Sequence, residues 1–417
     1  MTGVSAAHAD DTNTDKYDLI FSGNVKYNDQ PLDKVKIIVS GGGYTAEALT
    51  NEKGQWRIGV PEKKEYDITL VESTLPKGVI VSAEANDRLT ITEQGATIKA
   101  EFGLTNNKTV NFFLGQGVRE TVSFFDQFVS RAISGLNFGL MLALAAIGLS
   151  LVFGTTGISN FAHAEMVTFG ALMALTFGVI MAWPFWIAIP LAVILTGALG
   201  WAQDVALWKP LRVKGLSVEQ LMIVSIGFSL GLRYIYQYFY GGKTYQLPDA
   251  GSTKINILGP IALSVTDMIS MGVSIVMLVL VGYWLQKTKT GKATRAIADN
   301  SSLAAASGID VDRVVRFVWI FGSALAGLSG VLWAYFRPGI KWDMGWQILL
   351  LVFAAVVLGG LGTAYGALLG SIIVGLLVEL STLWIPSDLK YVGAFLVLIV
   401  VLLIRPQGIL GRSERIG

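Results

Sequence analysis

The pattern of apolar and polar positions divides the chain into two parts of different kinds. Between about residues 17 and 115, apolar and polar residues alternate in short runs such as 35–40 and 56–60. Alternation with a period of two predicts strands that bury one face. Residues 51–54 separate two of these runs and have a sequence typical of a hairpin turn. We therefore predict that the first part is a small all-β sandwich of about seven strands.

The second part consists of apolar runs long enough to cross a bilayer, which takes about 20 residues. These runs are 133–153, 160–181, 184–204, 219–240, 264–285, 314–336, 346–380 and 388–405. The run 346–380 is too long for one span and contains a glycine-rich stretch, so it predicts either two spans or a re-entrant pair. The predicted fold class is a polytopic α-helical membrane protein with about eight or nine hydrophobic segments, some of them broken, preceded by the all-β sandwich.

These patterns predict five regions along the chain. They are a leader at 1–16, an extracytoplasmic β-sandwich at 17–115, an interfacial linker helix at 116–132, a transmembrane domain at 133–412 and a cytoplasmic tail at 413–417. The small residues at 5–9 are typical of a signal-peptidase site, so the leader is either a signal-peptide remnant or a disordered segment. The apolar spacing within 118–132 fits an interfacial helix and equally an extension of the first span.

Composition narrows the class of protein further. Apolar residues make up 53% of the chain and charged residues 15%, which excludes an ordinary soluble domain and an intrinsically disordered chain. The chain has no cysteine and two histidines, so thiolate and multi-histidine metal sites are excluded, and we predict no metal and no cofactor. A net charge of +2 gives no indication of nucleic-acid binding.

The distribution of Lys and Arg predicts the orientation in the membrane. Basic residues gather in the segments 205–219 and 286–316 and in the C-terminal tail. Short loops rich in Lys and Arg stay on the cytoplasmic side. We therefore expect the C-terminus to be cytoplasmic and the N-terminal domain to be extracytoplasmic.

Two glycine-rich breaks interrupt the predicted spans, one in each half of the membrane part. They lie at 154–160 and 359–366. Paired breaks in corresponding places point to the substrate path of a transporter, because a broken helix frees backbone groups that need partners. The alternative is close helix packing through small residues. The candidate pathway residues are Gly157, Ser159, Asn160, His163, Glu165, Gly359, Gly360 and Gly362.

Ionisable residues within the predicted spans are further candidates. His163 and Glu165 follow the first break, and such groups in a membrane mark either a path or an internal pair. They either line the pathway or form a hydrogen-bonded cluster that fixes the bend. For Arg233 and Glu379 we expect a structural ion pair or a side chain that reaches the interface.

The loop 286–313 is long, basic and rich in small residues. It predicts two short helices, at about 292–299 and 302–307, with Asn300 or Ser301 as a cap and Gly308 as an end. Two interpretations are open. The loop is either a coupling helix that docks on a cytoplasmic motor or a solvated linker. The chain itself lacks a phosphate-binding loop, because the sequence before Gly242-Lys243-Thr244 has no glycine at position 237.

Four motifs in order resemble the permease subunits of branched-chain amino-acid ABC importers. They read GLSLVFGTTGISNFAHAEMVTFGA, ATRAIADNSSLAAASGIDVDRV, VVLGGLGTAYGALLGS and RPQGILG. The resemblance runs over about residues 124–412 and implies that 154–170 and 356–370 line a translocation path. It also implies that 292–309 contact an ABC ATPase, through Thr294, Arg295, Ala298, Asp299, Asn300, Gly308 and Ile309. One departure is Ala164, where the family usually has glycine between His and Glu.

The resemblance implies a transport subunit that is not itself an enzyme, in a bacterial cytoplasmic membrane. Its partners would be two cytoplasmic ABC ATPases, a second permease subunit, an extracytoplasmic substrate-binding protein and the lipid bilayer, with no nucleic acid. The substrate would be a branched-chain or other hydrophobic amino acid. Alternatives are a urea or short-amide importer of the same family, a secondary transporter, and a receptor or surface anchor.

Residues 17–75 resemble the transthyretin-like or carboxypeptidase-regulatory β-sandwich family, which implies a fold and no chemistry. Most permeases of the importer family lack such a domain. We hypothesise that it helps to dock the binding protein, and the alternative is a stabilising or spacing role.

Overall fold

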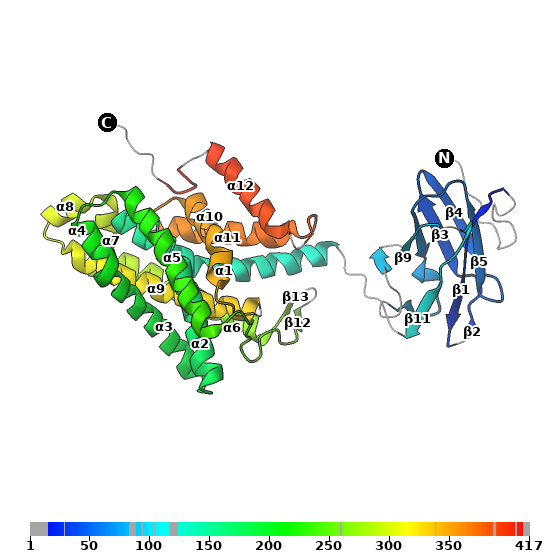
Figure 1. Cartoon of the computed structure of the whole chain (residues 1–417), viewed down its shortest axis with the longest axis horizontal. Helices are drawn as coiled ribbons and strands as arrows, with labels where there is room; N and C mark the ends of the chain where they lie inside the picture. The colour runs from blue at the N-terminus through cyan, green and yellow to red at the C-terminus, as the bar shows by residue number, and fades with distance from the viewer. Residues whose placement is uncertain are drawn as a thin grey trace. The chain divides into compact units, whose positions relative to one another are not determined.

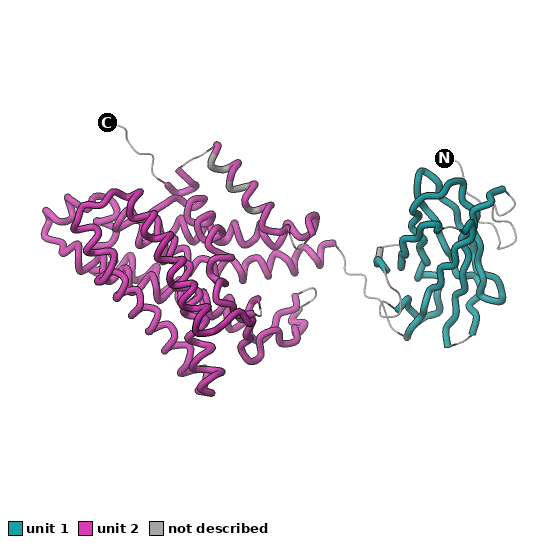
Figure 2. The backbone as a smooth tube through the Cα atoms, viewed as in Figure 1, with its two compact units in different colours: residues 1–122 teal, residues 123–417 magenta. Residues whose placement is uncertain are grey.

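The computed structural model describes residues 16–28, 30–82, 89–92, 95–103, 105–116, 124–258, 261–337, 339–386, 389–404 and 407–411. The chain forms two compact units, Met1–Val122 and Ser123–Gly417, which we call unit 1 and unit 2 (Figure 2). The predicted leader, apart from residue 16, and the predicted tail 413–417 lie outside the described residues. The division between the units falls close to the predicted change from β to helical structure.

Unit 1 is a β-sandwich of two sheets (Figure 1). Its strands are β1 (Leu19–Tyr27), β2 (Gln30–Pro31), β3 (Lys36–Gly41), β4 (Tyr44–Leu49), β5 (Gln55–Val60), β6 (Tyr66–Leu70), β7 (Val79–Val81), β8 (Leu89–Thr92), β9 (Gly95–Ala100), β10 (Asn107–Thr109) and β11 (Phe112–Gln116). One sheet has the order β4-β3-β6-β9-β8. The other has the order β10-β1-β11-β7, with β2 and β5 also paired to β1.

The predicted alternation in unit 1 is confirmed by burial. Ile37, Trp56, Ile58 and Ile68 are at most 1% exposed and face the core between the sheets. The turn at 51–54 also forms, but it does not make a hairpin, because β4 pairs with β3 and β5 pairs with β1. The turn therefore carries the chain from one sheet to the other.

Unit 2 is built from apolar helices (Figure 1). Its elements are α1 (Phe124–Thr156), α2 (His163–Leu175), η2 (Thr176–Ile180), α3 (Phe185–Gln203), η3 (Asp204–Trp208), α4 (Lys209–Val213), α5 (Val218–Tyr240), β12 (Ile255–Leu258), β13 (Ile261–Leu263), α6 (Val265–Lys287), α7 (Lys289–Asp299), α8 (Ser301–Ala306), α9 (Val311–Phe336), α10 (Met344–Gly359), α11 (Ala364–Ser381) and α12 (Lys390–Ile404). Seven helical segments among the described residues are long and apolar enough to span a membrane. The helices α10 and α12 are shorter apolar segments.

The bounds of the helices bear on two of the predictions. The run 346–380 forms the two helices α10 and α11, which are joined by residues 360–363. The helix α1 continues without a break from Phe124, so the described part of the predicted interfacial helix is an extension of the first span. Residues 117–123 of that prediction lie outside the described residues.

The helix α1 is the centre of unit 2, where it packs against α9 and α11. Small residues allow this close approach. A Cβ atom built on Gly148 would lie 2.4 Å from the carbonyl oxygen of Gly322 on α9, and one on Gly135 would lie 2.9 Å from that of Gly375 on α11. Close packing through small residues is how helices associate where lipid gives no hydrophobic driving force.

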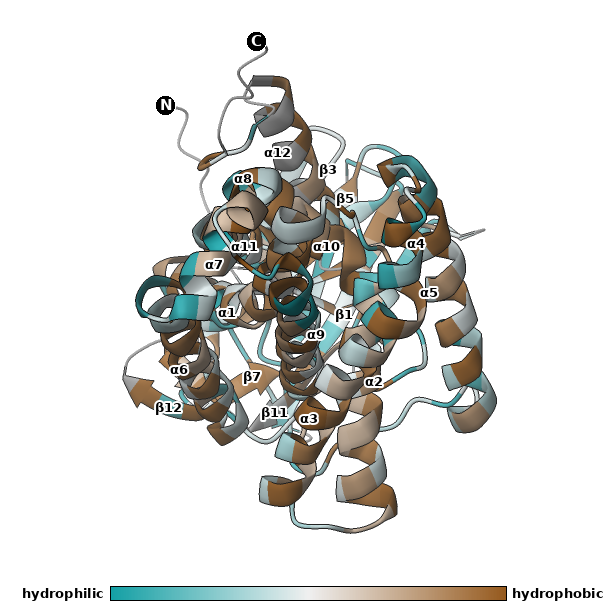
Figure 3. Cartoon of the chain, turned by 90° about the vertical axis from the view of Figure 1, so that its left-hand side faces the viewer, coloured by the Kyte–Doolittle hydropathy of each residue, from teal (hydrophilic) through white to brown (hydrophobic). Residues whose placement is uncertain are grey.

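The outward faces of unit 2 are apolar. Brown, hydrophobic positions predominate on α3, α5 and α6 in Figure 3. Large apolar side chains such as Ile223, Ile194 and Val279 are each 65% exposed. Exposed apolar surface of this extent is expected where a helix contacts lipid or another apolar chain.

Candidate functional site

The first break joins α1 to α2 through a turn that is stabilised by side chains. Gly157 has a φ of +71°, a conformation that favours glycine. Asn160 Oδ1 then accepts a hydrogen bond from the amide of Ala162 at 3.0 Å. Because Asn160 belongs to this turn, α2 begins at His163.

His163 ties the first turn of α2 to α1. Its Nε2 lies 2.9 Å from the carbonyl oxygen of Ala145, and the residue is 2% exposed. Asn160 precedes the start of α2, and His163 is the first residue of that helix. The contact of His163 is with the backbone of α1 in the protein interior.

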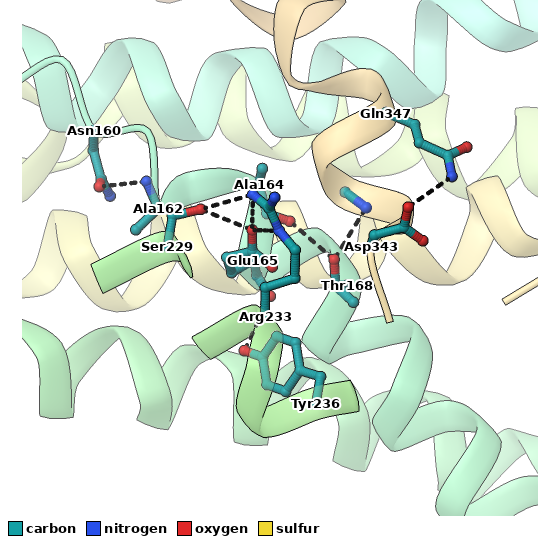
Figure 4. Close-up of polar contacts among 11 residues, drawn as sticks. Asn160, Ala162, Ala164, Glu165, Thr168, Ser229, Arg233, Tyr236, Asp343 and Gln347 are labelled. Atoms are coloured by element: carbon teal, nitrogen blue, oxygen red, sulfur yellow. Dashed lines mark hydrogen bonds and ion pairs between the residues drawn. The ribbon is translucent and has the colours of Figure 1, made fainter. Parts of the chain in front are cut away.

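Glu165 is the centre of a buried polar cluster between α2, α5 and α10 (Figure 4). We define the Glu165 cluster as Glu165, Ser229, Arg233 and Trp346. Glu165 Oε1 accepts from Ser229 Oγ at 2.8 Å and from Arg233 Nη2 at 3.2 Å, and Glu165 is 0% exposed. The guanidinium of Arg233 also lies over the ring of Trp346, 4.1 Å from its centroid. A charge is tolerated at this depth because it is paired and hydrogen-bonded.

One face of α5 supplies most of the partners for the first break. Its buried residues are spaced by three or four positions and are Leu221, Ser225, Ser229, Arg233 and Tyr236. Ser225 Oγ accepts from the amide of Phe161 at 3.1 Å, and the Tyr236 hydroxyl donates to the carbonyl oxygen of Glu165 at 3.3 Å. Ser225, Ser229 and Tyr236 were not among the candidate residues predicted from the sequence. Their spacing of three or four residues along the face of Arg233, inside an apolar span, is the signal that identifies them.

The start of α10 packs against α2 at Ala164, the residue that departs from the family pattern. A Cβ atom on Gly345 would lie 1.9 Å from the carbonyl oxygen of Ala164. The amide of Gly345 donates to Thr168 Oγ1 at 3.0 Å (Figure 4). Ala164 is 2% exposed, so its methyl group is accommodated inside the protein. The position in this contact that has no room for a side chain is therefore Gly345, and not residue 164.

The second break lies beside the first. Gly360 and Gly362 have φ values of +111° and +78°, and Thr363 Oγ1 donates to the carbonyl oxygen of Gly360 at 2.8 Å. A Cβ atom on Gly154 at the end of α1 would lie 2.9 Å from the carbonyl oxygen of Gly362. It would also lie 3.4 Å from Cβ of Ala298 on α7. The two breaks and the predicted coupling segment therefore meet at one end of unit 2.

The C-terminal motif covers the second break. The amide of Leu410 donates to the carbonyl oxygen of Gly359 at 2.9 Å, and that of Ile409 donates to the carbonyl oxygen of Leu358 at 2.8 Å. These bonds satisfy carbonyl groups that the end of α10 leaves without helical partners. The glycines of the second break are thus held by backbone contacts on two sides.

The loop 286–313 contains the two predicted short helices, α7 and α8. Asn300 is confirmed as the cap of α8, since its Oδ1 accepts from the amide of Leu303 at 2.9 Å. Gly308 has a φ of +88°, and Asp310 caps α9 through the amide of Arg313 at 3.0 Å. Ile297, Ala304 and Val314 form a small core beneath these helices. Capping and this core fix the shape of the loop, and we call the folded loop 286–313 the knob.

The seven predicted coupling residues divide between the core and the surface of this knob. Thr294 is 2% exposed and Ile309 is half-buried, so both hold the knob together. The exposed members are Arg295, Ala298, Asp299, Asn300 and Gly308. Leu303, which the sequence analysis had not assigned, is 68% exposed on α8.

Metal binding finds no support among the described residues, because they contain no group of three His, Asp or Glu side chains that would hold an ion. Asn160, His163 and Glu165 face the protein interior, whereas Gly157 and Ser159 are partly exposed. The buried polar residues therefore stabilise the first break from inside the protein, and the knob lies next to both breaks.

Helices of this length and hydrophobicity are those of a multi-span membrane protein. Residues 131–403 match the family described as the permease component of the branched-chain amino acid transport system, so the chain belongs to this family. The family is the permease component of ABC transporters and is not itself an enzyme. Unit 1 lies outside the matched residues.

Relatives match over nearly their whole length. The high-affinity branched-chain amino acid transport system permease protein LivH of Escherichia coli is 30% identical over 302 residues, which are 70% of this chain and 97% of that protein. BraD of Pseudomonas aeruginosa is 28% identical and is covered to 97%. The probable branched-chain amino acid transport permease protein LivH of Methanocaldococcus jannaschii is 33% identical and is covered to 89%.

Proposed function

We propose that this chain is the transmembrane permease subunit of an ABC importer for branched-chain or other hydrophobic amino acids. The proposal rests on two observations taken together, the family to which the chain belongs and the folded shape of its loop 286–313. The chain covers 97% of a branched-chain amino acid permease, and its loop 286–313 folds into a capped projection between α6 and α9. The import cycle is alternating access driven by ATP hydrolysis on partner chains.

The knob is the proposed docking surface for the ATPases. Arg295 and Asp299 are exposed on α7, and Leu303 is exposed on α8. A partner groove would take up the leucine side chain, and the two charges would fix its register. Because Ala298 lies beside Gly154, and Gly154 in turn lies against Gly362, movement of the knob would reach the first break directly and the second break through Gly154.

The two breaks are the proposed border of the translocation path. Gly157 and Ser159 present partly exposed backbone at the first break, and Gly360 and Gly362 form the second. The Glu165 cluster supports this border from within, since its charges are paired and buried. In this proposal Asn160, His163 and Glu165 position the path, and the partly exposed residues line it.

The proposed orientation places the knob in the cytoplasm of a bacterial-type cell membrane. α1 ends and α7 begins at the same end of unit 2, where Lys287 and Lys289 also lie. Basic residues at one end favour the cytoplasmic side. Phe124, at the other end of α1, would then be extracytoplasmic, and unit 1, which precedes it, would lie outside.

The proposed assembly has two ATPases, a second permease and a substrate-binding protein. The exposed apolar faces of α5 and α6 suit lipid and a second permease, because Tyr238, Phe239 and Val279 are 84%, 74% and 65% exposed. A binding protein would deliver substrate at the end away from the knob.

A copurification experiment tests the coupling surface. We expect two ABC ATPases to copurify with the wild-type chain from gently solubilised membranes. The double variant Arg295→Glu, Asp299→Arg and the single variant Leu303→Asp should lose them, whereas Lys108→Glu in unit 1 should retain them. Copurification that survives both knob variants would place the ATPase contact elsewhere.

An uptake experiment tests substrate and energy source. We expect uptake of leucine that stops when ATP is depleted, with urea and short amides failing to compete. Uptake that persists without ATP while an ion gradient remains would instead favour a secondary transporter.

A further inference from the structure

A pocket of about 410 Å³ lies at the end of unit 2 away from the knob. It is bordered by the start of α1, the cap of α6 and the ends of α9 and α11, through Arg131, Ser264, Arg337 and Glu379. Figure 1 shows the neighbouring β12 and β13 at this end, with α7 and α8 at the other. The volume falls within the range of small-molecule sites, about 300–1,000 Å³.

One residue that lines the pocket carries a buried acceptor with no donor among the described residues. Asn137 lines the pocket and is 1% exposed. Its Nδ2 donates to Asp267 Oδ1 at 3.1 Å, but its Oδ1 accepts no hydrogen bond from any described residue. A buried polar atom without a partner is uncommon, because leaving it unpaired costs free energy. A ligand that brings a donor would satisfy it.

The neighbouring carboxylate specifies what kind of donor fits. Asp267 Oδ2 accepts from the Ser264 amide at 3.1 Å and from Ser264 Oγ at 2.7 Å, and within the described part of the chain no basic side chain forms an ion pair with it. An ammonium group carries a positive charge and three donors. It therefore matches a carboxylate next to an empty amide acceptor better than a neutral hydroxyl does.

The same pocket also holds cations in excess of its acids. Glu379 is already paired with Lys390 at 2.8 Å, and Arg337 donates to the Tyr391 hydroxyl at 2.9 Å. Arg131 and Lys254 also line the pocket and make no ion pair with any residue that the structure describes. A carboxylate on the ligand would be held by this excess charge.

An apolar wall completes the pocket. Trp333 is 5% exposed, and its ring centroid lies 5.8 Å from that of Phe336, which also lines the pocket. Aromatic rings of this kind take up aliphatic groups. An inorganic anion would make no contact with this apolar wall and would bring no donor to Asn137 Oδ1. A simple amine would bring no negative charge to Arg131 and Lys254.

We propose that this pocket binds a free α-amino acid with an apolar side chain. The ammonium group contacts Asn137 Oδ1 and Asp267, and the carboxylate contacts Arg131 and Lys254. The side chain lies against the aromatic wall. The inference rests on the proposed import function, and it assigns the pocket as a loading site that receives substrate before the broken helices open.

Direct binding to the purified full-length chain tests the site without any partner. Tritiated L-leucine is the probe, with no binding protein and no nucleotide present. We expect 3-methylbutylamine, which lacks the carboxylate, and 4-methylpentanoate, which lacks the amine, to compete at least tenfold more weakly than L-leucine. Glycine, which lacks the side chain, should also compete at least tenfold more weakly. Equal competition by either single-group analogue would overturn recognition of both charges.

Substitutions locate the binding. We expect Asn137→Leu, Asp267→Asn and Lys254→Gln each to raise the Kd for leucine at least tenfold. Lys214→Gln, an exposed lysine that does not line the pocket, should leave the Kd unchanged. Asp267→Asn preserves the shape of the side chain, so it remains informative if Asn137→Leu fails to elute as a single species. An unchanged Kd in the Asp267→Asn and Lys254→Gln variants would overturn the inference.

Failure of the pocket inference can be distinguished from failure of the proposed import function. If the wild-type chain binds no leucine while the assembled transporter imports it with ATP, the pocket inference fails and the importer stands. If the assembled transporter imports no amino acid, the proposed function itself fails.

Discussion

The two units of this protein differ in what close glycine contacts and exposed apolar side chains contribute to the fold. Unit 1 buries large apolar side chains, and Trp56, Tyr66 and Phe21 are at most 2% exposed in its core. Unit 2 also buries large side chains such as Trp208 and Trp319, but it brings glycines of different helices together inside and leaves further large apolar side chains outside, with Trp186 at 77% exposure. The difference follows from the solvent, because apolar burial stabilises a fold in water, whereas close packing and paired polar groups stabilise one in lipid.

The largest effect that we predict comes from a substitution at a glycine contact in unit 2. In Gly148→Val, the new side chain would meet the carbonyl oxygen of Gly322, since a Cβ atom there lies at 2.4 Å. We expect loss of nearly all correctly folded protein from the membrane, measured as the yield of a single species in size-exclusion chromatography.

The matched control for this prediction is Gly231→Val in α5, where a Cβ atom has no neighbour within 4 Å. Both variants replace a helical glycine by valine, so the change in intrinsic helix propensity is the same in each, and it is not a cost because valine is the better helix former. Equal yields of the two variants would show that close glycine packing does not distinguish unit 2.

A second, intermediate effect is predicted for the Glu165 cluster. Arg233→Met removes the buried partner of Glu165 and leaves its carboxylate uncompensated, which costs about 3–5 kcal/mol. We expect a lower thermal unfolding midpoint in detergent and loss of leucine uptake. The control is the double variant Glu165→Leu, Arg233→Met, which removes both charges and should recover most of the stability. If the double variant is as unstable as the single one, the pair does not act as a unit.

The sequence was sufficient to predict what depends on local periodicity. The alternation around Trp56 and Ile58 predicts buried strands because each residue's environment follows from its position in a period of two. Asn300 was identifiable as a cap because capping acts over three residues. The helices of unit 2 likewise follow from the length of their apolar runs.

Contacts between distant segments were not predictable in this way. The partner of β5 is β1 rather than the strand across the turn, and that choice depends on how two sheets stack. Glu165 was a candidate because an acid in a span is uncommon, but its pairing with Ser229 and Arg233 depends on the rotation of α5, 64 and 68 residues away. The pocket at the end of unit 2 away from the knob combines the ends of several helices, so no single segment indicates it.

The smallest effect is predicted for removal of unit 1 itself. Deleting residues 1–115 should leave unit 2 folded, because unit 1 has its own core and α1 finds its packing partners in α9 and α11. Under the docking hypothesis, the deletion weakens delivery by the binding protein, and we expect a rise of about tenfold or less in the binding-protein concentration that gives half-maximal uptake, about 1.4 kcal/mol. ATPase copurification should not change. Unchanged uptake at equal expression would argue against docking and for a spacing role, and unit 1 would then be a domain that folds in water beside a transporter that does not need it.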